Sequence, residues 1–189
     1  MKLLWSVLIS IACAASFAQS DAEKGSHIPS QAAADVMREF AGTDGAFLAA
    51  GLVKSGFQKD DLASLIQFPT DELVVVTITG TQVRQAFERS LSLYPQANSH
   101  FLQISGFEVT FSKEAPTGQR VLQVRCNNLP LEESKDYQVA MPALLGRGGL
   151  GYFKIWDKSK ITKTYNATIE SILKGKKVVE SSPRWVAFS

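Results

Sequence analysis

The apolar and polar positions of this chain follow the period of a strand in some segments and the period of a helix in others. Val74–Thr79 is apolar on both faces, which predicts a central strand rather than an edge strand. After Gly80, apolar residues recur at helical spacing, while Arg84 and Glu88 lie four apart on the opposite side. The stripe consists of Val83, Ala86, Phe87, Ser90, Leu91 and Tyr94. We therefore expect an amphipathic helix packed on the preceding strand.

Further segments predict additional strands and helices. Phe107, Val109 and Phe111 alternate with polar residues, which indicates a strand with one face in the core. Ser105-Gly106 is the expected hinge between this strand and the one before it. The other expected elements are helices over 32–40, 61–66 and 167–173 and strands over 46–49, 120–126 and 137–141. Because helices and antiparallel strands are mixed, we expect a single α+β domain with mixed sheets and flanking helices.

The N-terminus has the three parts of a secretory signal peptide. Lys2 is the basic residue, Leu3–Ala15 is the apolar stretch, and Ser16-Phe17-Ala18 offers small residues for cleavage after Ala18. The apolar stretch is too short for a stable membrane span. We therefore expect a secreted or periplasmic protein, with a lipoprotein signal at Cys13 as the alternative.

Composition divides the remaining chain into three parts. Residues 19–29 are small, polar and charged and are expected to form a mobile lead-in. The domain is expected over residues 30–180, and residues 181–189 are expected to be a C-terminal tail.

Charge and cysteine content exclude several classes of function. The chain has 20 basic and 18 acidic residues and a net charge of +2, so we expect no nucleic acid or membrane-surface partner. Cys126 is the single cysteine after Ala18, which excludes an intrachain disulfide there and favours a buried thiol. Trp156 and Trp185 are expected to be packing residues.

The sequence offers no motif for metal or acid–base catalysis. Two-metal phosphoesterase chemistry needs carboxylates and histidines that converge on the ions. The chain has two histidines, His27 and His100, and neither lies in a cluster with ligand spacing. We therefore expect no catalytic residue, no metal site and no cofactor, and we expect the chain to be inactive by itself.

Three blocks in one order resemble a known family. They are LVVVTITGTQVRQAFERS (Leu73–Ser90), FLQISGFEVTF (Phe101–Phe111) and YQVAMPALLGRGGLGYF (Tyr137–Phe153). Over about residues 30–180 the chain resembles the C-terminal, substrate-binding domain of the 5′-nucleotidase (UDP-sugar hydrolase) family. The family's metal-bearing catalytic domain lies N-terminal to this region, and the resemblance finds no counterpart of it here.

The resemblance also implies a set of ligand-binding residues. Members of the family hold a nucleobase between two phenylalanines, and by this match the first ring is Phe101. Gln103 falls where bacterial members have asparagine or glutamine, and Leu144 falls at the position of the second ring. The aspartate that holds the ribose hydroxyls is replaced by Leu150, and an arginine of the family is replaced by Lys54.

These replacements weaken the expected nucleotide affinity. A ribose hydroxyl buried without a partner against Leu150 would cost about 1–3 kcal/mol. Lys54 keeps the charge of arginine and loses its planar two-pronged fit to phosphate. The glycine-rich loop over residues 146–153 is interpreted as a tight turn rather than a phosphate cradle, with Arg147 as a contact for an anion.

Two hypotheses from different classes follow, and a purely structural role stays open as a third. In the first, a secreted, non-catalytic domain binds a protein partner or a small molecule that is nucleoside-like or flat and apolar. The small molecule would pack against Phe101, between Leu144 and Leu150. In the second, the chain is the substrate-binding component of a nucleotide hydrolase in nucleotide catabolism and acts with a separately encoded metallophosphoesterase. The sequence leaves equally open that Leu144 and Leu150 fill the cleft and close it.

Overall fold

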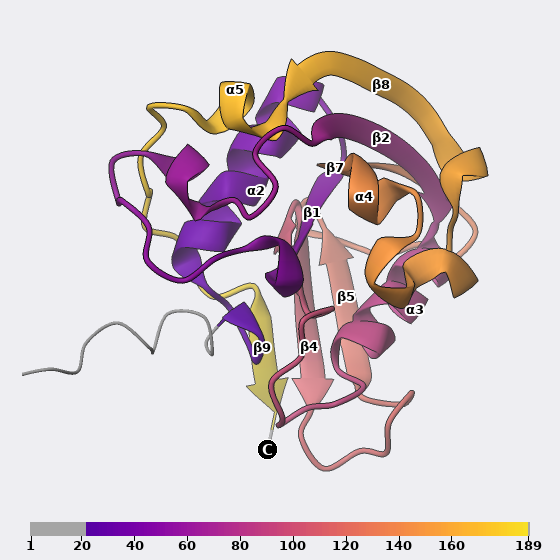
Figure 1. Ribbon diagram of the computed structural model, residues 1–189. Helices are drawn as coiled ribbons and strands as arrows, with labels where there is room; N and C mark the ends of the chain where they lie inside the picture. Colours follow the sequence, from indigo (N-terminus) through magenta and orange to yellow (C-terminus); the bar gives the residue numbers. More distant parts are fainter. Residues whose placement is uncertain (1–21, 189) are drawn as a thin grey trace, which may run out of the picture.

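Two β-sheets form the framework of the structure, a computed structural model that describes residues 22–188 (Figure 1). The larger sheet has the order β3-β1-β7-β2-β8 and the smaller one has the order β6-β5-β4-β9. The strands of the larger sheet are β1 (Gly45–Ala49), β2 (Glu72–Thr79), β3 (Leu102–Ser105), β7 (Asp136–Pro142) and β8 (Ile161–Thr168). Those of the smaller sheet are β4 (Phe107–Ser112), β5 (Val121–Cys126), β6 (Leu129–Pro130) and β9 (Trp185–Phe188).

The helices are short, apart from two. The α-helices are α2 (Ile28–Ala41), α3 (Gly80–Ser90), α4 (Ala143–Gly146) and α5 (Ile169–Leu173). The 3-10 helices are η1 (Ala50–Leu52), η2 (Leu62–Leu65), η3 (Gly149–Lys154) and η4 (Lys158–Lys160). The expected α+β class is therefore confirmed, although α2 begins earlier than the expected helix over 32–40.

Strand β2 has the central position that its apolar sequence predicts. It pairs antiparallel with β7 on one side and with β8 on the other. Val74, Val75 and Val76 are all buried, because both faces of the sheet are covered at this point.

Helix α3 begins and packs as its sequence predicts. The Thr79 hydroxyl accepts a hydrogen bond from the backbone of Gln82, and the Gln82 side chain accepts one from the backbone of Thr79, which forms a capping box. Val83, Ala86, Phe87, Ser90 and Leu91 are buried, so the apolar stripe is confirmed, and Tyr94 at its end is partly buried.

The chain passes from the larger to the smaller sheet at Gly106. This residue has a φ of +76°, and a Cβ atom there would lie 2.1 Å from the carbonyl oxygen of Asp44. Glycine is therefore required at the bend between β3 and β4. The predicted hinge at Ser105-Gly106 is confirmed.

Aromatic rings fill the space where α3 and the two sheets meet. The ring of Phe87 lies 5.6 Å from that of Phe47, 5.7 Å from that of Phe107 and 5.4 Å from that of Trp185, each in an edge-to-face arrangement. Phe47 belongs to β1, Phe107 to β4 and Trp185 to β9, so one ring of α3 contacts both sheets. The predicted core positions of Phe87 and Trp185 are confirmed.

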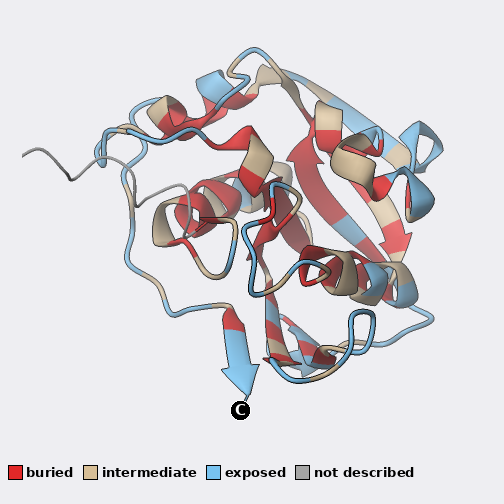
Figure 2. Ribbon diagram, turned by 60° about the horizontal axis from the view of Figure 1, so that its bottom comes forward, coloured by how far each residue is buried: buried red, intermediate tan, exposed pale blue. Residues whose placement is uncertain are grey.

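Both ends of the described chain differ from the expected boundaries. Trp185–Phe188, expected to be part of a tail, forms β9 parallel to β4, and Figure 2 shows this strand buried at its start and exposed over the rest. Ala22 and His27, expected in a mobile lead-in, are buried, and α2 already begins at Ile28. These segments are held by hydrogen bonds to distant residues, which the periodicity of the sequence does not report.

The predicted signal peptide over residues 1–18, including Cys13, lies outside the described residues. Within residues 22–188, no helix is long and apolar enough to cross a membrane. Cys126 is buried, as expected, and burial together with the nearby charge of Asp44 raises the pKa of its thiol to about 11.

Replacement of the central ring tests this core. Phe87→Ala is expected to lower the free energy of unfolding by about 3–5 kcal/mol, because it removes buried surface and leaves a cavity. Leu122→Ala on β5 is the control, since half of the Leu122 side chain is exposed and little should change. Urea unfolding of both variants measures the effect, and equal stability of Phe87→Ala and the parent would contradict the assigned core.

Candidate functional site

Phe101, the residue expected to stack on a ligand, is buried in the protein. Only 1% of it is exposed, and its ring lies 4.7 Å from the ring of Trp185, tilted by 48°. The indole N–H of Trp185 donates a hydrogen bond of 2.8 Å to the carbonyl oxygen of Leu102, which fixes the orientation of the indole. One side of the Phe101 ring is therefore covered by the C-terminal strand of the same chain.

Gln103, expected beside the same ligand, is completely buried and uses its amide for the chain itself. Its side-chain nitrogen donates to the carbonyl oxygens of Ala22 and Gly25, at 2.8 and 2.7 Å. Its side-chain oxygen accepts from the backbone N–H of His27 at 2.9 Å. Both N–H groups of the amide are thus engaged, so the amide has no donor left for a base.

The segment bound by Gln103 also holds the C-terminal strand. The Ser26 hydroxyl accepts hydrogen bonds from the backbone N–H groups of Arg184 and Trp185, at 2.9 and 3.0 Å. The Arg184 guanidinium pairs with Asp35 on α2 at 2.7 Å and donates to the carbonyl oxygen of Ile104 on β3 at 2.6 Å. The two ends of the described chain are therefore connected to each other and to β3.

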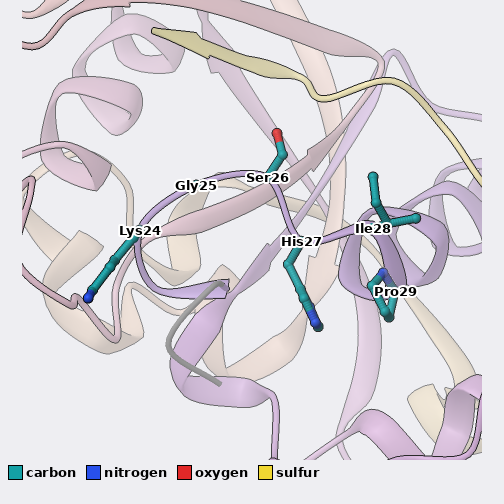
Figure 3. A pocket seen from close by; sticks show the side chains of 6 residues that line it. All are labelled: Lys24, Gly25, Ser26, His27, Ile28 and Pro29. Atoms are coloured by element: carbon teal, nitrogen blue, oxygen red, sulfur yellow. The ribbon is translucent and has the colours of Figure 1, made fainter. Parts of the chain in front are cut away.

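A small hollow of about 410 Å³ lies against this segment and is lined by residues 24–29. Figure 3 shows that Ser26 and His27 point to opposite sides of the segment and that Lys24 extends away from both. The His27 ring contacts the Ser30 hydroxyl at 2.8 Å, and its centre lies 6.2 Å from that of the Phe57 ring, with the two planes at 86°. The side chain of Ser26 therefore serves the C-terminal strand, while that of His27 lies on the side of α2 and Phe57.

The two leucines of the expected cleft pack against the core. Leu144 and Leu150 are both partly buried, and Leu150 lies beside Gly51, where a Cβ atom would be 3.5 Å from its methyl group. Gly51 donates its N–H to Ser99, and Ala50 donates to Phe101, so Leu150 lies near the backbone that precedes β3.

Lys54 and Arg147 are exposed. None of the six expected ligand residues lines any of the three cavities described for residues 22–188.

A polar cluster around Tyr152 was not predicted from the sequence. The buried Tyr152 hydroxyl donates to the carbonyl oxygen of His100 at 2.6 Å, and its ring stacks on Trp156 at 4.7 Å. The Arg89 guanidinium lies over the same ring, 5.2 Å from its centre. The His100 ring contacts the Ser92 hydroxyl at 3.0 Å. Tyr152 lies in the glycine-rich loop over residues 146–153, but nothing in its spacing points to Arg89 as its partner.

His100 is neutral at neutral pH. Burial lowers its pKa to about 4, and the positive charge of Arg89 acts in the same direction. Burial likewise raises the pKa of Tyr152 well above its usual range. Within residues 22–188, no group of three or more histidine, cysteine or acidic side chains is placed to hold a metal ion.

Comparison with known sequences identifies the family. The sequence model of the 5′-nucleotidase C-terminal domain matches residues 9–157, which is most of the chain. The chain belongs to this family.

Curated relatives of this 5′-nucleotidase C-terminal domain are much longer proteins. The snake venom 5′-nucleotidase of Naja atra is 36% identical over 89 residues, which is 43% of this chain and 17% of the venom protein. The trifunctional nucleotide phosphoesterase protein YfkN of Bacillus subtilis is 30% identical over 115 residues, which is 58% of this chain and 8% of that protein. The chain thus spans less than a fifth of each of these two relatives.

A solved structure supports the fold of the domain. The 5′-nucleotidase precursor of Thermus thermophilus superposes with a TM-score of 0.73 at 22% sequence identity. The match covers 89% of this chain and 37% of the other. The α+β architecture is therefore shared with this structure.

The low pKa of His100 predicts a pH dependence of stability. The folded state binds the His100 proton less tightly than the unfolded chain, so stability should fall as the pH decreases from about 6.5 to about 4. His100→Gln removes this contribution and should lose less stability between neutral pH and pH of about 4.5 than the parent does. Urea unfolding at both pH values measures the loss of stability in each protein. Protonation of carboxyl groups contributes to the loss in both proteins, so the comparison between them reports His100. Equal losses would contradict the assignment.

Proposed function

We propose that this chain is a non-catalytic binding domain whose nucleoside site is closed by the two ends of the described part of the chain. Two observations carry the proposal. The ring of Trp185 packs on the ring of Phe101, and residues 22–27 take up the hydrogen bonds of the Gln103 amide. A nucleoside bound in the manner of the family would need both residues. The domain therefore recognises a protein partner or a small molecule through other parts of its surface.

The free energies support a closed site. An aromatic side chain buries about 150–250 Å², which at about 25 cal/mol per Å² is about 4–6 kcal/mol for Trp185. Stacking of a base on an aromatic ring contributes about 1–3 kcal/mol. Displacement of Trp185 by a base would therefore cost more than the new contact contributes, and the hydrogen bonds of Gln103 would be lost as well.

We further propose that the protein is secreted or periplasmic and inactive as a phosphoesterase by itself. The N-terminal sequence supports the first statement, with cleavage after Ala18. The second is supported by the two histidines of the sequence, which serve separate local contacts: His27 with Ser30, and His100 with Ser92.

The second candidate function is the substrate-binding component of a nucleotide hydrolase that acts with a separately encoded metallophosphoesterase. The names of the relatives, 5′-nucleotidase and nucleotide phosphoesterase, favour it. The exposed cations Lys54 and Arg147 would then be available to a nucleotide phosphate.

Ligand binding and turnover distinguish these proposals. The chain beginning at Gln19 is expected to show no thermal stabilisation by the uncharged nucleosides adenosine and uridine and no AMP hydrolysis with added Mn²⁺. A ligand at 100 times its Kd would add about 2.7 kcal/mol of stability, which thermal unfolding detects easily. Leu150→Asp restores the acidic residue of the family and should remain without binding, because Phe101 stays covered.

Two outcomes would overturn the first proposal. One is stabilisation by adenosine that Phe101→Ala abolishes, which would show that the ring is accessible. The other is AMP turnover that persists through repurification and scales with protein concentration. Stabilisation by AMP that Lys54→Gln weakens, without turnover, would favour the second candidate function.

A further inference from the structure

The largest of the described cavities lies away from Phe101, on the outer side of α3. It has a volume of about 690 Å³, in the range that small-molecule sites occupy. Three parts of the chain enclose it. They are α3 itself, the turn between β4 and β5 at Thr117-Gly118, and the end of η3 with Ile155, which follows it.

Two of the charged side chains that line this cavity already have partners within the protein. The Glu88 carboxylate accepts the backbone N–H groups of Arg120 and Val121, at 3.0 and 2.7 Å. The Arg84 guanidinium pairs with Glu133 at 2.6 Å. These groups are therefore engaged in holding α3 to its neighbours.

The other two charges of the cavity, Arg89 and Lys154, are both positive and have no acidic partner. Within residues 22–188 the ion pairs are Arg84 with Glu133 and Arg184 with Asp35. Neither charge is therefore part of an ion pair, and the Glu88 carboxylate, held by backbone N–H groups, is the acidic group that lines the same cavity.

Arg89 is held in position by one hydrogen bond and by packing against Tyr152. Its guanidinium donates to the carbonyl oxygen of Leu150 at 2.6 Å and lies over the ring of Tyr152. Its buried Nε has no partner among the described residues. A Cβ atom on Gly151 would lie 2.2 Å from a terminal nitrogen of Arg89, so the glycine with its φ of +78° makes room for this group. The packing therefore preorganises a cation whose donors are mostly unused.

We propose that this cavity binds the phosphate or carboxylate group of a small anionic compound, held by Arg89 and Lys154. A fixed guanidinium suits both groups because its parallel N–H donors match two oxygen atoms. Lys154 supplies a second, mobile charge, and the exposed side chain of Gln85 lies on the same wall for the remainder of the compound. This site is separate from Phe101 and Gln103, so it does not depend on the proposed function.

Titration of the chain beginning at Gln19 with inorganic phosphate and with succinate, at constant ionic strength, tests the proposal. Backbone amide shifts in ¹H–¹⁵N spectra should change mainly in α3 and η3. Lys154→Gln is expected to weaken binding by about tenfold through loss of a charge-assisted contact. Lys177→Gln is the matched control, since Lys177 is exposed, carries the same charge and does not line the cavity.

Arg89→Lys keeps the charge and removes the paired donors, so it should also weaken binding, with its fold checked by the same spectra. Preference for phosphate over succinate, or the reverse, identifies the anionic group. The proposal is overturned if neither anion binds, if the shift changes spread over the whole surface, or if Lys177→Gln weakens binding as much as Lys154→Gln.

Discussion

The buried amide of Gln103 is the constraint on which the arrangement of this domain depends. A buried amide left without partners costs about 1–3 kcal/mol, so β3 requires a polar segment beside it. Residues 22–27 supply that segment. The same segment fixes β9 through the Ser26 hydroxyl, and β9 brings Trp185 onto Phe101. The Gln103 side chain thus holds the first described segment, and through that segment it also holds the strand whose Trp185 covers Phe101.

This arrangement separates the fold of the family from its ligand site. The rings of Phe47, Phe87 and Phe107 join α3 to both sheets without any contribution from the residues that the family uses for a nucleoside. The scaffold can therefore persist while the ligand residues change. Trp185 contacts both groups of residues, since it packs on Phe87 and also on Phe101.

Periodicity predicted the parts of this structure that local burial determines. The central strand at Val74–Val76, the buried face of α3 and the bend at Gly106 depend on apolar spacing or on one special residue, and all three are confirmed. The covering of Phe101 and Gln103 depends on contacts between residues about 80 positions apart. A short polar segment such as residues 22–27 has the composition of a mobile lead-in, because its anchor is an amide elsewhere in the sequence. The resemblance identifies the residues at the positions of the family's site, and only the packing shows what they contact.

Amide hydrogen exchange of the parent protein tests the central claim most directly. The backbone N–H groups of His27, Arg184 and Trp185 donate to Gln103 and Ser26, so they should exchange far more slowly than the same groups in an unstructured peptide. Protection of all three, close to that of β3, is the result that the closed site predicts. Exchange at the rate of an unstructured chain would show that the two ends leave β3, and it would contradict the closure of the site.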